Sequence, residues 1–289
     1  MKLKNKEPKL FIHLGLPKTG TTFLQHHIFP QLPKEVLFLE KATNVSIWEL
    51  LDSNAKKLLI SSEHLLANPF KKYDIGWKST FVNNFHRLHQ LFPTARYILT
   101  LRKQEGLLAS YYKEHISKGG RTNYPDIDAF FDIENNQGHI KMEDLYFTEL
   151  IELIHSISGE LPLIILQEEV KANPEVVFQH LCYFMELKEV TYQAVKKQVN
   201  IGVYKKQAAW LLRMNRLNQH LSKFGLDLYH PVLKKLGLTP DYIARKRMLM
   251  FGREPYRLPD EMVAFMSNHY QEDWQRMLFY KAQKDQSLD

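Results

Sequence analysis

Short apolar runs alternate with segments of helical spacing through the first two thirds of the chain. Four runs have the length and the Leu and Ile content of buried strands, at residues 10–14, 57–61, 97–101 and 163–166. Apolar strands that are separated by helices are typical of a parallel sheet covered on both faces. The pattern therefore predicts an α/β fold with a central parallel sheet flanked by helices on both faces.

After Asn200 the pattern becomes helical and basic. Residues 205–221 place leucines at helical spacing among lysines and arginines. A last helix is expected from Pro259 to about Lys284, because the acidic residues at its start suit the helix dipole. Residues 124–140, which are rich in acidic and amide side chains, are expected to form a surface excursion between helices.

The chain has no internal repeat, low-complexity tract or Gly/Ser linker. We therefore expect one domain over residues 1–289, with an α/β core at residues 8–200 and a helical C-terminal subregion at residues 201–289. A length of 289 residues with 44% hydrophobic residues is sufficient for a large core.

The chain is basic, with a formal net charge of +7 and an isoelectric point near 9.2. This favours acidic partners such as nucleic acid, anionic membrane, polyanionic glycans or phosphorylated cofactors. The one cysteine, Cys182, lies in an apolar stretch and is expected to be a buried thiol. The charged N-terminus has no signal-peptide core, and no apolar run is long enough to span a membrane. We expect a cytoplasmic protein, with peripheral contact at the inner face of a membrane left open.

A glycine-rich loop, LGLPKTGTTFL, lies where the first strand turns into the first helix. Gly15 and Gly20 allow the backbone to close around an anion, and the first amides of the helix point at it without partners of their own. The spacing is that of the P-loop GxxxxGK[ST], except that Thr21 occupies the lysine position and the lysine is found at Lys18. The loop therefore suits a phosphate but not a γ-phosphate with its magnesium ion.

A second anion site is expected after the strand at residues 97–101. Arg102 follows this strand directly, and Ser110 comes eight residues later on the second turn of the expected helix. A guanidinium and a hydroxyl in these places can converge on one phosphate through charge-assisted hydrogen bonds. The two sites together suit a ligand that is phosphorylated at both ends of a ribose.

The segment from Pro17 to Leu24 resembles the 5′-phosphosulfate loop of sulfotransferases that use 3′-phosphoadenosine 5′-phosphosulfate (PAPS), and the Arg-x7-Ser pair resembles their 3′-phosphate motif. The similarity covers roughly residues 10–215 and becomes less specific toward its end. It implies a P-loop NTPase-like sulfotransferase fold and an enzyme that releases 3′,5′-adenosine bisphosphate. The residues that the resemblance assigns to the nucleotide are Gly15, Pro17, Lys18, Thr19, Gly20, Thr21, Thr22, Arg102 and Ser110, with Lys205 or Lys206 in a later loop.

The resemblance also implies the catalytic groups. Lys18 would meet the bridging oxygen of the leaving phosphate and the charge that develops on it. The segment at residues 59–65 corresponds to the family's base segment, in which His64 matches a histidine that deprotonates the acceptor hydroxyl. Other branches of the family use a glutamate, which keeps Glu63 open as the base, and neighbouring strand residues point to opposite faces.

The expected reaction is in-line transfer of a sulfuryl group to a hydroxyl or amine, without a metal, because no metal-ligand spacing is found in the sequence. Family analogy favours a carbohydrate or glycolipid acceptor, and no nucleic-acid partner is expected. Two other hypotheses stay open at this point. One is a P-loop kinase for a small molecule, and the other is a non-enzymatic basic module that binds nucleic acid or anionic membrane through the segment at residues 205–235.

Overall fold

The structure is a computed structural model that describes residues 8–40, 55–63, 65–67, 77–117, 126–188, 190–194, 203–246, 252 and 254–287. The chain divides into two compact units. The sheet unit comprises Met1–Lys103, Tyr146–Lys197 and Tyr270–Asp289, and the helical unit comprises Gln104–Leu145 and Gln198–His269. Each unit is described by itself, and the single-domain organisation expected from the sequence stays a prediction.

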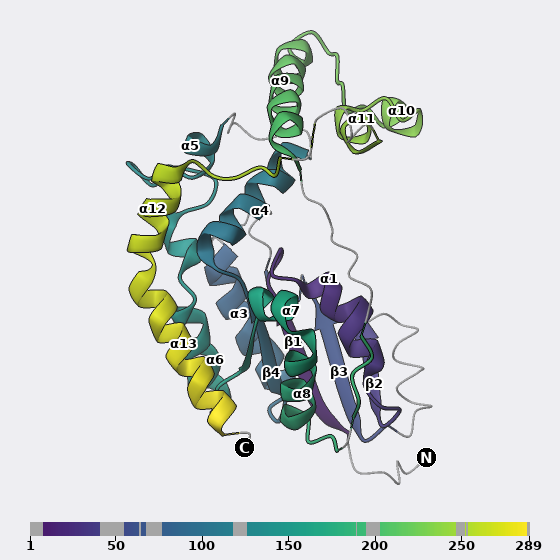
Figure 1. The fold of residues 1–289 in the computed structure, drawn as a ribbon, viewed down its shortest axis with the longest axis vertical. Coiled ribbons are helices and arrows are strands. Elements are labelled where there is room, and N and C mark those ends of the chain that lie inside the picture. Colours follow the sequence, from purple (N-terminus) through teal and green to yellow (C-terminus); the bar gives the residue numbers. More distant parts are fainter. Residues whose placement is uncertain are drawn as a thin grey trace. The chain divides into compact units, whose positions relative to one another are not determined.

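The sheet unit is built on five parallel strands in the order β2-β3-β1-β4-β5 (Figure 1). Their bounds are β1 Lys9–Gly15, β2 Val36–Glu40, β3 Lys57–Ser62, β4 Arg96–Leu101 and β5 Leu163–Leu166. The parallel sheet and four of its strands confirm the sequence prediction, whereas β2 was missed. Its four apolar residues, Val36–Leu39, form a run as continuous as those of the other strands, so the apolar pattern was present and was overlooked.

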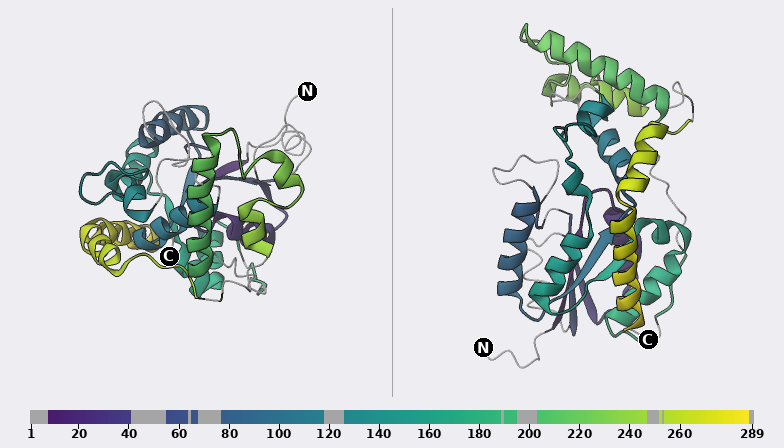
Figure 2. Two further views of the ribbon diagram at one scale, coloured as in Figure 1. Left: turned by 90° about the horizontal axis from the view of Figure 1, so that it is seen from above. Right: turned by 90° about the vertical axis from the view of Figure 1, so that its left-hand side faces the viewer.

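Helices cover both faces of the sheet, as predicted (Figures 1 and 2). On one face, Phe11, Leu59 and Ile98 from three adjacent strands form a buried cluster with η1 (Leu24–Ile28) and α8 (Pro174–Phe184). On the other face, Tyr97 packs edge-to-face against Phe85 of α3 (Trp77–Leu91), with ring centroids 4.8 Å apart. Apolar burial on both sides fixes the register of the strands.

The described part of the sheet unit contains further helices, and α13 packs against both α6 and β5. Asp273 on α13 accepts hydrogen bonds from the backbone amides of Phe147 and Thr148 at 3.0 Å each, and so caps the N-terminus of α6. These helices are α1 Thr21–Phe23, η2 Phe29–Gln31, α6 Thr148–Ser158, α7 Gln167–Ala172 and α13 Gln271–Gln286.

The helical unit is centred on α4, which contacts both α9 and α12. Asn215 of α9 donates a hydrogen bond to the carbonyl of Ile116 at 2.9 Å, and this joins α9 to the end of α4. The helices of this unit are α4 Gln104–Ser117, α5 Ile127–Phe130, η3 Met142–Leu145, α9 Lys205–Ser222, α10 Pro231–Lys235, α11 Pro240–Lys246 and α12 Asp260–His269. No helix in the described ranges combines the length and the apolar composition that crossing a bilayer requires.

Two local predictions were wrong. The expected last helix is two helices, because the chain leaves the helical conformation at Tyr270, where the helical unit ends and the sheet unit resumes. The described part of the expected surface excursion contains the fully buried side chains of Phe130, Phe131 and Ile140. Aromatic packing therefore holds this segment in the helical unit despite its polar composition.

Candidate functional site

The loop between β1 and α1 adopts backbone conformations that its sequence anticipates only in part. Gly20 has a φ of 101°, in the left-handed region that favours glycine, and a Cβ added to it would lie 3.2 Å from the side chain of Gln167. Lys18 also has a positive φ, of 68°. A lysine gains nothing from this conformation and loses about 1–2 kcal/mol. Such local strain is typical of ligand clamps, so the conformation marks Lys18 as part of a site.

Gly15 is needed because Thr21 lies directly against it. A Cβ at Gly15 would approach the Thr21 Oγ1 to 2.5 Å and its methyl group to 2.9 Å. The Thr21 side chain is 1% exposed, and its Oγ1 has no hydrogen-bond partner among the described residues. Because buried hydroxyls in proteins are almost always hydrogen-bonded, this oxygen is suited to a ligand such as a phosphate.

A network of hydrogen-bonded, buried side chains connects the loop to the strands of the sheet. The Thr19 hydroxyl lies 2.6 Å from the carbonyl oxygen of Leu16 and 2.9 Å from the Thr100 hydroxyl on β4. His13 on β1 places its Nε2 3.2 Å from the same Thr100 hydroxyl and its Nδ1 2.7 Å from the Ser61 hydroxyl on β3. Three adjacent strands therefore contribute to one network that ends in the loop.

The direction of each hydrogen bond in this network follows from the Leu16 carbonyl, which can only accept. Thr19 donates its one hydroxyl hydrogen to that carbonyl, so Thr100 must donate to Thr19. The hydrogen of Thr100 is then used, so His13 must carry a proton on Nε2 and donate it to Thr100. Nδ1 of the neutral ring accepts from Ser61. Burial lowers the pKa of His13 to about 3, in agreement with a ring that carries one proton.

The hydrogen-bonded network continues from Ser61 into η1. Gln25 donates from Nε2 to the Ser61 hydroxyl at 3.0 Å. Gln25 belongs to η1, a π-helical segment, and π-helical turns occur preferentially at functional sites. The phenyl ring of Phe29 packs edge-on against His13 at a centroid distance of 5.2 Å and keeps water from the network.

One residue of the second predicted phosphate site, Arg102, lies beside the loop. Arg102, at the end of β4, donates from Nη1 to the backbone carbonyl of Lys18 at 3.4 Å. Lys171 on α7 adds a third cation to this region. Burial, and secondarily the charge of Arg102, lower the pKa of Lys171, while the nearby carboxylate of Glu168 opposes that shift. An anion at this place would relieve the repulsion between the cations.

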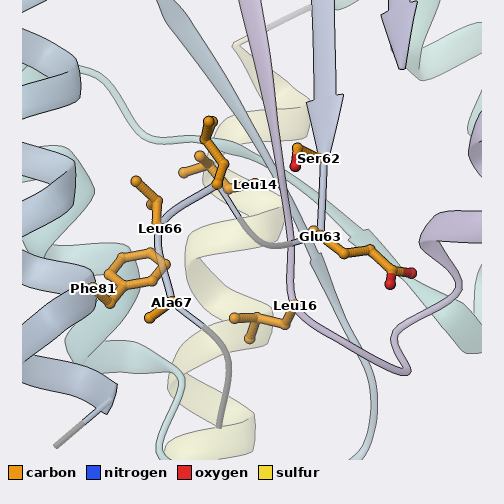
Figure 3. A pocket seen from close by; sticks show the side chains of 9 residues that line it. Leu14, Leu16, Ser62, Glu63, Leu66, Ala67 and Phe81 are labelled. Atoms are coloured by element: carbon orange, nitrogen blue, oxygen red, sulfur yellow. The ribbon is translucent and has the colours of Figure 1, made fainter. Parts of the chain in front are cut away.

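Glu63, one of the two candidate bases, lies directly after β3 and lines a small, shallow hollow that is open to solvent. The other lining side chains are mostly apolar and include Leu14, Leu66 and Phe81. Figure 3 shows the Glu63 carboxylate directed away from Leu66 and Phe81. The other candidate base, His64, lies outside the described residues.

Three predicted site residues belong to the helical unit, so their relation to the loop stays a prediction. Ser110 is half-buried on the second turn of α4, as expected from the sequence. Lys205 and Lys206 are exposed at the start of α9. Lys205 forms an ion pair with Glu254, at 2.9 Å between Nζ and Oε1.

The remaining loop residues differ in the groups that they can offer to a ligand. Pro17 is buried, Thr22 is exposed, and Lys18 is half-buried. Because the Thr19 hydroxyl hydrogen is used within the loop, the backbone amide of Thr19 is left as its donor to an anion.

Sequence reasoning missed the supporting network and Lys171. A polar residue at alternate positions of an otherwise apolar strand was the available signal, as at His13, Ser61 and Thr100. This signal does not reveal that the three side chains meet. Only the register does, since His13 is paired with Ser61 and Gly15 with Thr100 across neighbouring strands.

Comparison with known proteins gives a family for most of the chain. A family model described as "Sulfotransferase domain" matches residues 7–221. A search of curated proteins gave no match. Among solved structures, a sulfotransferase from Alicyclobacillus acidocaldarius is similar at 15% sequence identity and a TM-score of 0.42, covering 76% of this chain and 93% of that chain. The family match includes the loop, Glu63, Arg102, Ser110 and nearly all of α9, and it ends before α10.

Proposed function

This chain belongs to the sulfotransferase domain family, whose members use PAPS as donor, and we propose that its loop holds the 5′-phosphosulfate end of that donor for transfer to a hydroxyl acceptor. One observation carries this assignment. The buried Thr21 hydroxyl lies against Gly15 with no partner among the described residues, at the N-terminus of the first helix. A hydroxyl and a set of helix amides suit a phosphate, and the position of Lys18 suits the charge that develops on it.

We assign the donor contacts as follows. The amides of Thr19 to Thr22 and the Thr21 hydroxyl bind the 5′-phosphate. Arg102 and Ser110 bind the 3′-phosphate, with Lys205 or Lys206 completing that site. The contact between Arg102 and the backbone of Lys18 supports the part of this assignment that concerns Arg102, because it places that guanidinium beside the loop.

The reaction is one displacement at sulfur. The acceptor oxygen attacks and forms a new S–O bond, while the S–O bond to the 5′-phosphate breaks and its electron pair leaves with 3′,5′-adenosine bisphosphate. Lys18 stabilises the charge that builds on the leaving oxygen. Glu63 or His64 takes the acceptor proton. No step in this scheme requires a metal ion.

The acceptor that we propose is a carbohydrate or glycolipid hydroxyl. The hollow beside Glu63 supports an acceptor with an apolar portion, because Leu14, Leu66 and Phe81 line it. Incubating the protein with labelled donor and a panel of glycans, glycolipids and phenols tests this choice, and transfer to phenols alone would contradict it.

Isothermal titration calorimetry tests the donor assignment. The protein should bind 3′,5′-adenosine bisphosphate without a divalent ion, and Thr21→Val should weaken this binding while leaving the fold intact, because valine keeps the shape of the side chain. Thr239→Val is the matched control, since that hydroxyl is also buried without a partner among the described residues but belongs to the helical unit. Tight binding of ATP with magnesium and no heat from the bisphosphate would instead support a kinase.

A further inference from the structure

Exposed apolar side chains are concentrated in one part of the helical unit. Of the twelve large hydrophobic side chains that are exposed in the described part of the chain, seven fall between Leu217 and Tyr242. The most exposed of these are Phe224 at 72%, Leu236 at 65% and Leu226 at 57%. Exposed apolar side chains that gather in one segment of a folded unit point to an interaction surface.

The positive charge of the protein is concentrated in the same segment. Residues 205–246 contain nine lysines and arginines against two aspartates, an excess of seven. The formal net charge of the whole chain is also +7, so the rest of the sequence is neutral overall. The family match ends at residue 221, so four of these nine basic residues lie inside the matched domain and five lie beyond it.

Basic and apolar side chains share one side of α9. Arg213, Arg216 and Leu217 are spaced three and four residues apart and are all exposed, and Lys223 and Phe224 follow at the end of the helix. The next segments carry the same two kinds of side chain. Val232 in α10 is exposed, Leu236 directly after this helix is also exposed, and the two lysines that end the helix lie between them in the sequence. Helix α11 packs against α9 (Figure 1), so the group is part of one folded unit.

We propose that this surface, which we name the basic apolar face, docks onto an anionic membrane. It comprises the exposed apolar and basic side chains from Arg213 of α9 to Leu236, the residue that follows α10. Lysines and arginines meet anionic headgroups, and the apolar side chains enter the boundary between headgroups and acyl chains.

Charge and chemistry favour this occupant over two others. A second copy of the same face would bring two surfaces of like charge together, which opposes self-association. Nucleic acid would match the charge but would leave Phe224, Leu226 and Leu236 without an apolar environment. A membrane satisfies both kinds of side chain. The inference concerns the helical unit alone and does not rest on the donor site.

Co-sedimentation with vesicles tests the proposal. The protein should bind phosphatidylcholine vesicles that contain phosphatidylglycerol far better than pure phosphatidylcholine vesicles, and high salt should weaken this binding. Lys234→Gln with Lys235→Gln should lower the partition coefficient about thirtyfold, at roughly 1 kcal/mol per lysine near the surface. Phe224→Ser with Leu226→Ser should lower it about tenfold or more, through lost apolar burial. Both pairs of substitutions are at exposed positions, and circular dichroism is used to check that the variants fold.

The matched control is Lys34→Gln with Lys188→Gln, which removes the same charge from exposed positions of the sheet unit and should change binding by less than about threefold. Equal loss in the control pair would overturn the proposal, as would no gain from phosphatidylglycerol. A dimer in light scattering that Phe224→Ser with Leu226→Ser converts to a monomer would assign the face to a second copy. Binding to duplex RNA that only the lysine pair weakens would assign it to nucleic acid. Calorimetry with 3′,5′-adenosine bisphosphate on the same samples reports the donor site separately.

Discussion

Replacing Thr100 by valine removes one hydroxyl from the centre of the buried network and keeps the shape of the side chain. The Nε2 proton of His13 then has no acceptor, which costs about 1–3 kcal/mol, and Thr19 loses an accepted hydrogen bond worth about 0.5–1.5 kcal/mol. No cavity forms, so these two losses are the whole effect. We expect Thr100→Val to lower the free energy of unfolding by about 2–4 kcal/mol and the melting temperature by about 5–10 °C.

Thr100→Val should also weaken the binding of 3′,5′-adenosine bisphosphate to the loop. Without Thr100, the Thr19 hydroxyl is free to rotate away from the Leu16 carbonyl, and ordering the loop then costs part of the binding energy of 3′,5′-adenosine bisphosphate. Urea unfolding followed by circular dichroism gives the stability, and calorimetry gives the affinity. Thr239→Val is the control, because its buried hydroxyl has no partner among the described residues and its loss should be neutral or stabilising. If the two valine variants were equally stable, the network would contribute nothing and the reasoning would be refuted.

The other predictions concern separate parts of the sheet unit. Burial lowers the pKa of His13 from 6.5 to about 3, so between these pH values the unfolded chain binds a proton at His13 that the folded protein does not. The contribution of His13 to the free energy of unfolding is therefore complete above pH 6.5. Below pH 6.5 it falls by about 1.4 kcal/mol per pH unit. Urea midpoints between pH 4 and pH 7 should therefore fall less steeply for His13→Asn than for the wild type, and parallel curves would show that the ring is not buried as a neutral group. Lys18→Ala should reduce kcat by about 100- to 1,000-fold, whereas a change in KM alone would make the lysine a ground-state anchor. Gly15→Ala places a methyl group against the Thr21 hydroxyl and should weaken nucleotide binding by about tenfold or more, and calorimetry that gives an unchanged Kd would contradict the close approach. Asp273→Ala removes the cap of α6 and should destabilise the protein by about 2–4 kcal/mol in urea titrations, with no change in affinity for the bisphosphate if the role is structural only.

Much of the fold could be predicted because local patterns encode it. The predicted strands are mostly apolar and are separated by segments of helical spacing, which is the pattern of a parallel sheet with helices on both faces. The break at Tyr270 could not be predicted in this way. Residues on both sides of it have good helical patterns, and Asp273 directly after the break is hydrogen-bonded to the start of α6, more than a hundred residues earlier in the sequence.

The sequence by itself determined the phosphate loop, its departure from the nucleotide triphosphatase pattern and the family, because these depend on spacing along the chain. Only the tertiary structure decided which hydroxyl of the loop is used internally and which is left for a ligand. Thr19 and Thr21 look equivalent in the sequence, but the pairing of β1 with β3 and β4 brings His13, Ser61 and Thr100 together beneath the loop. Hydrogen-bond directions pass through residues far apart in the chain, so no local pattern can specify them.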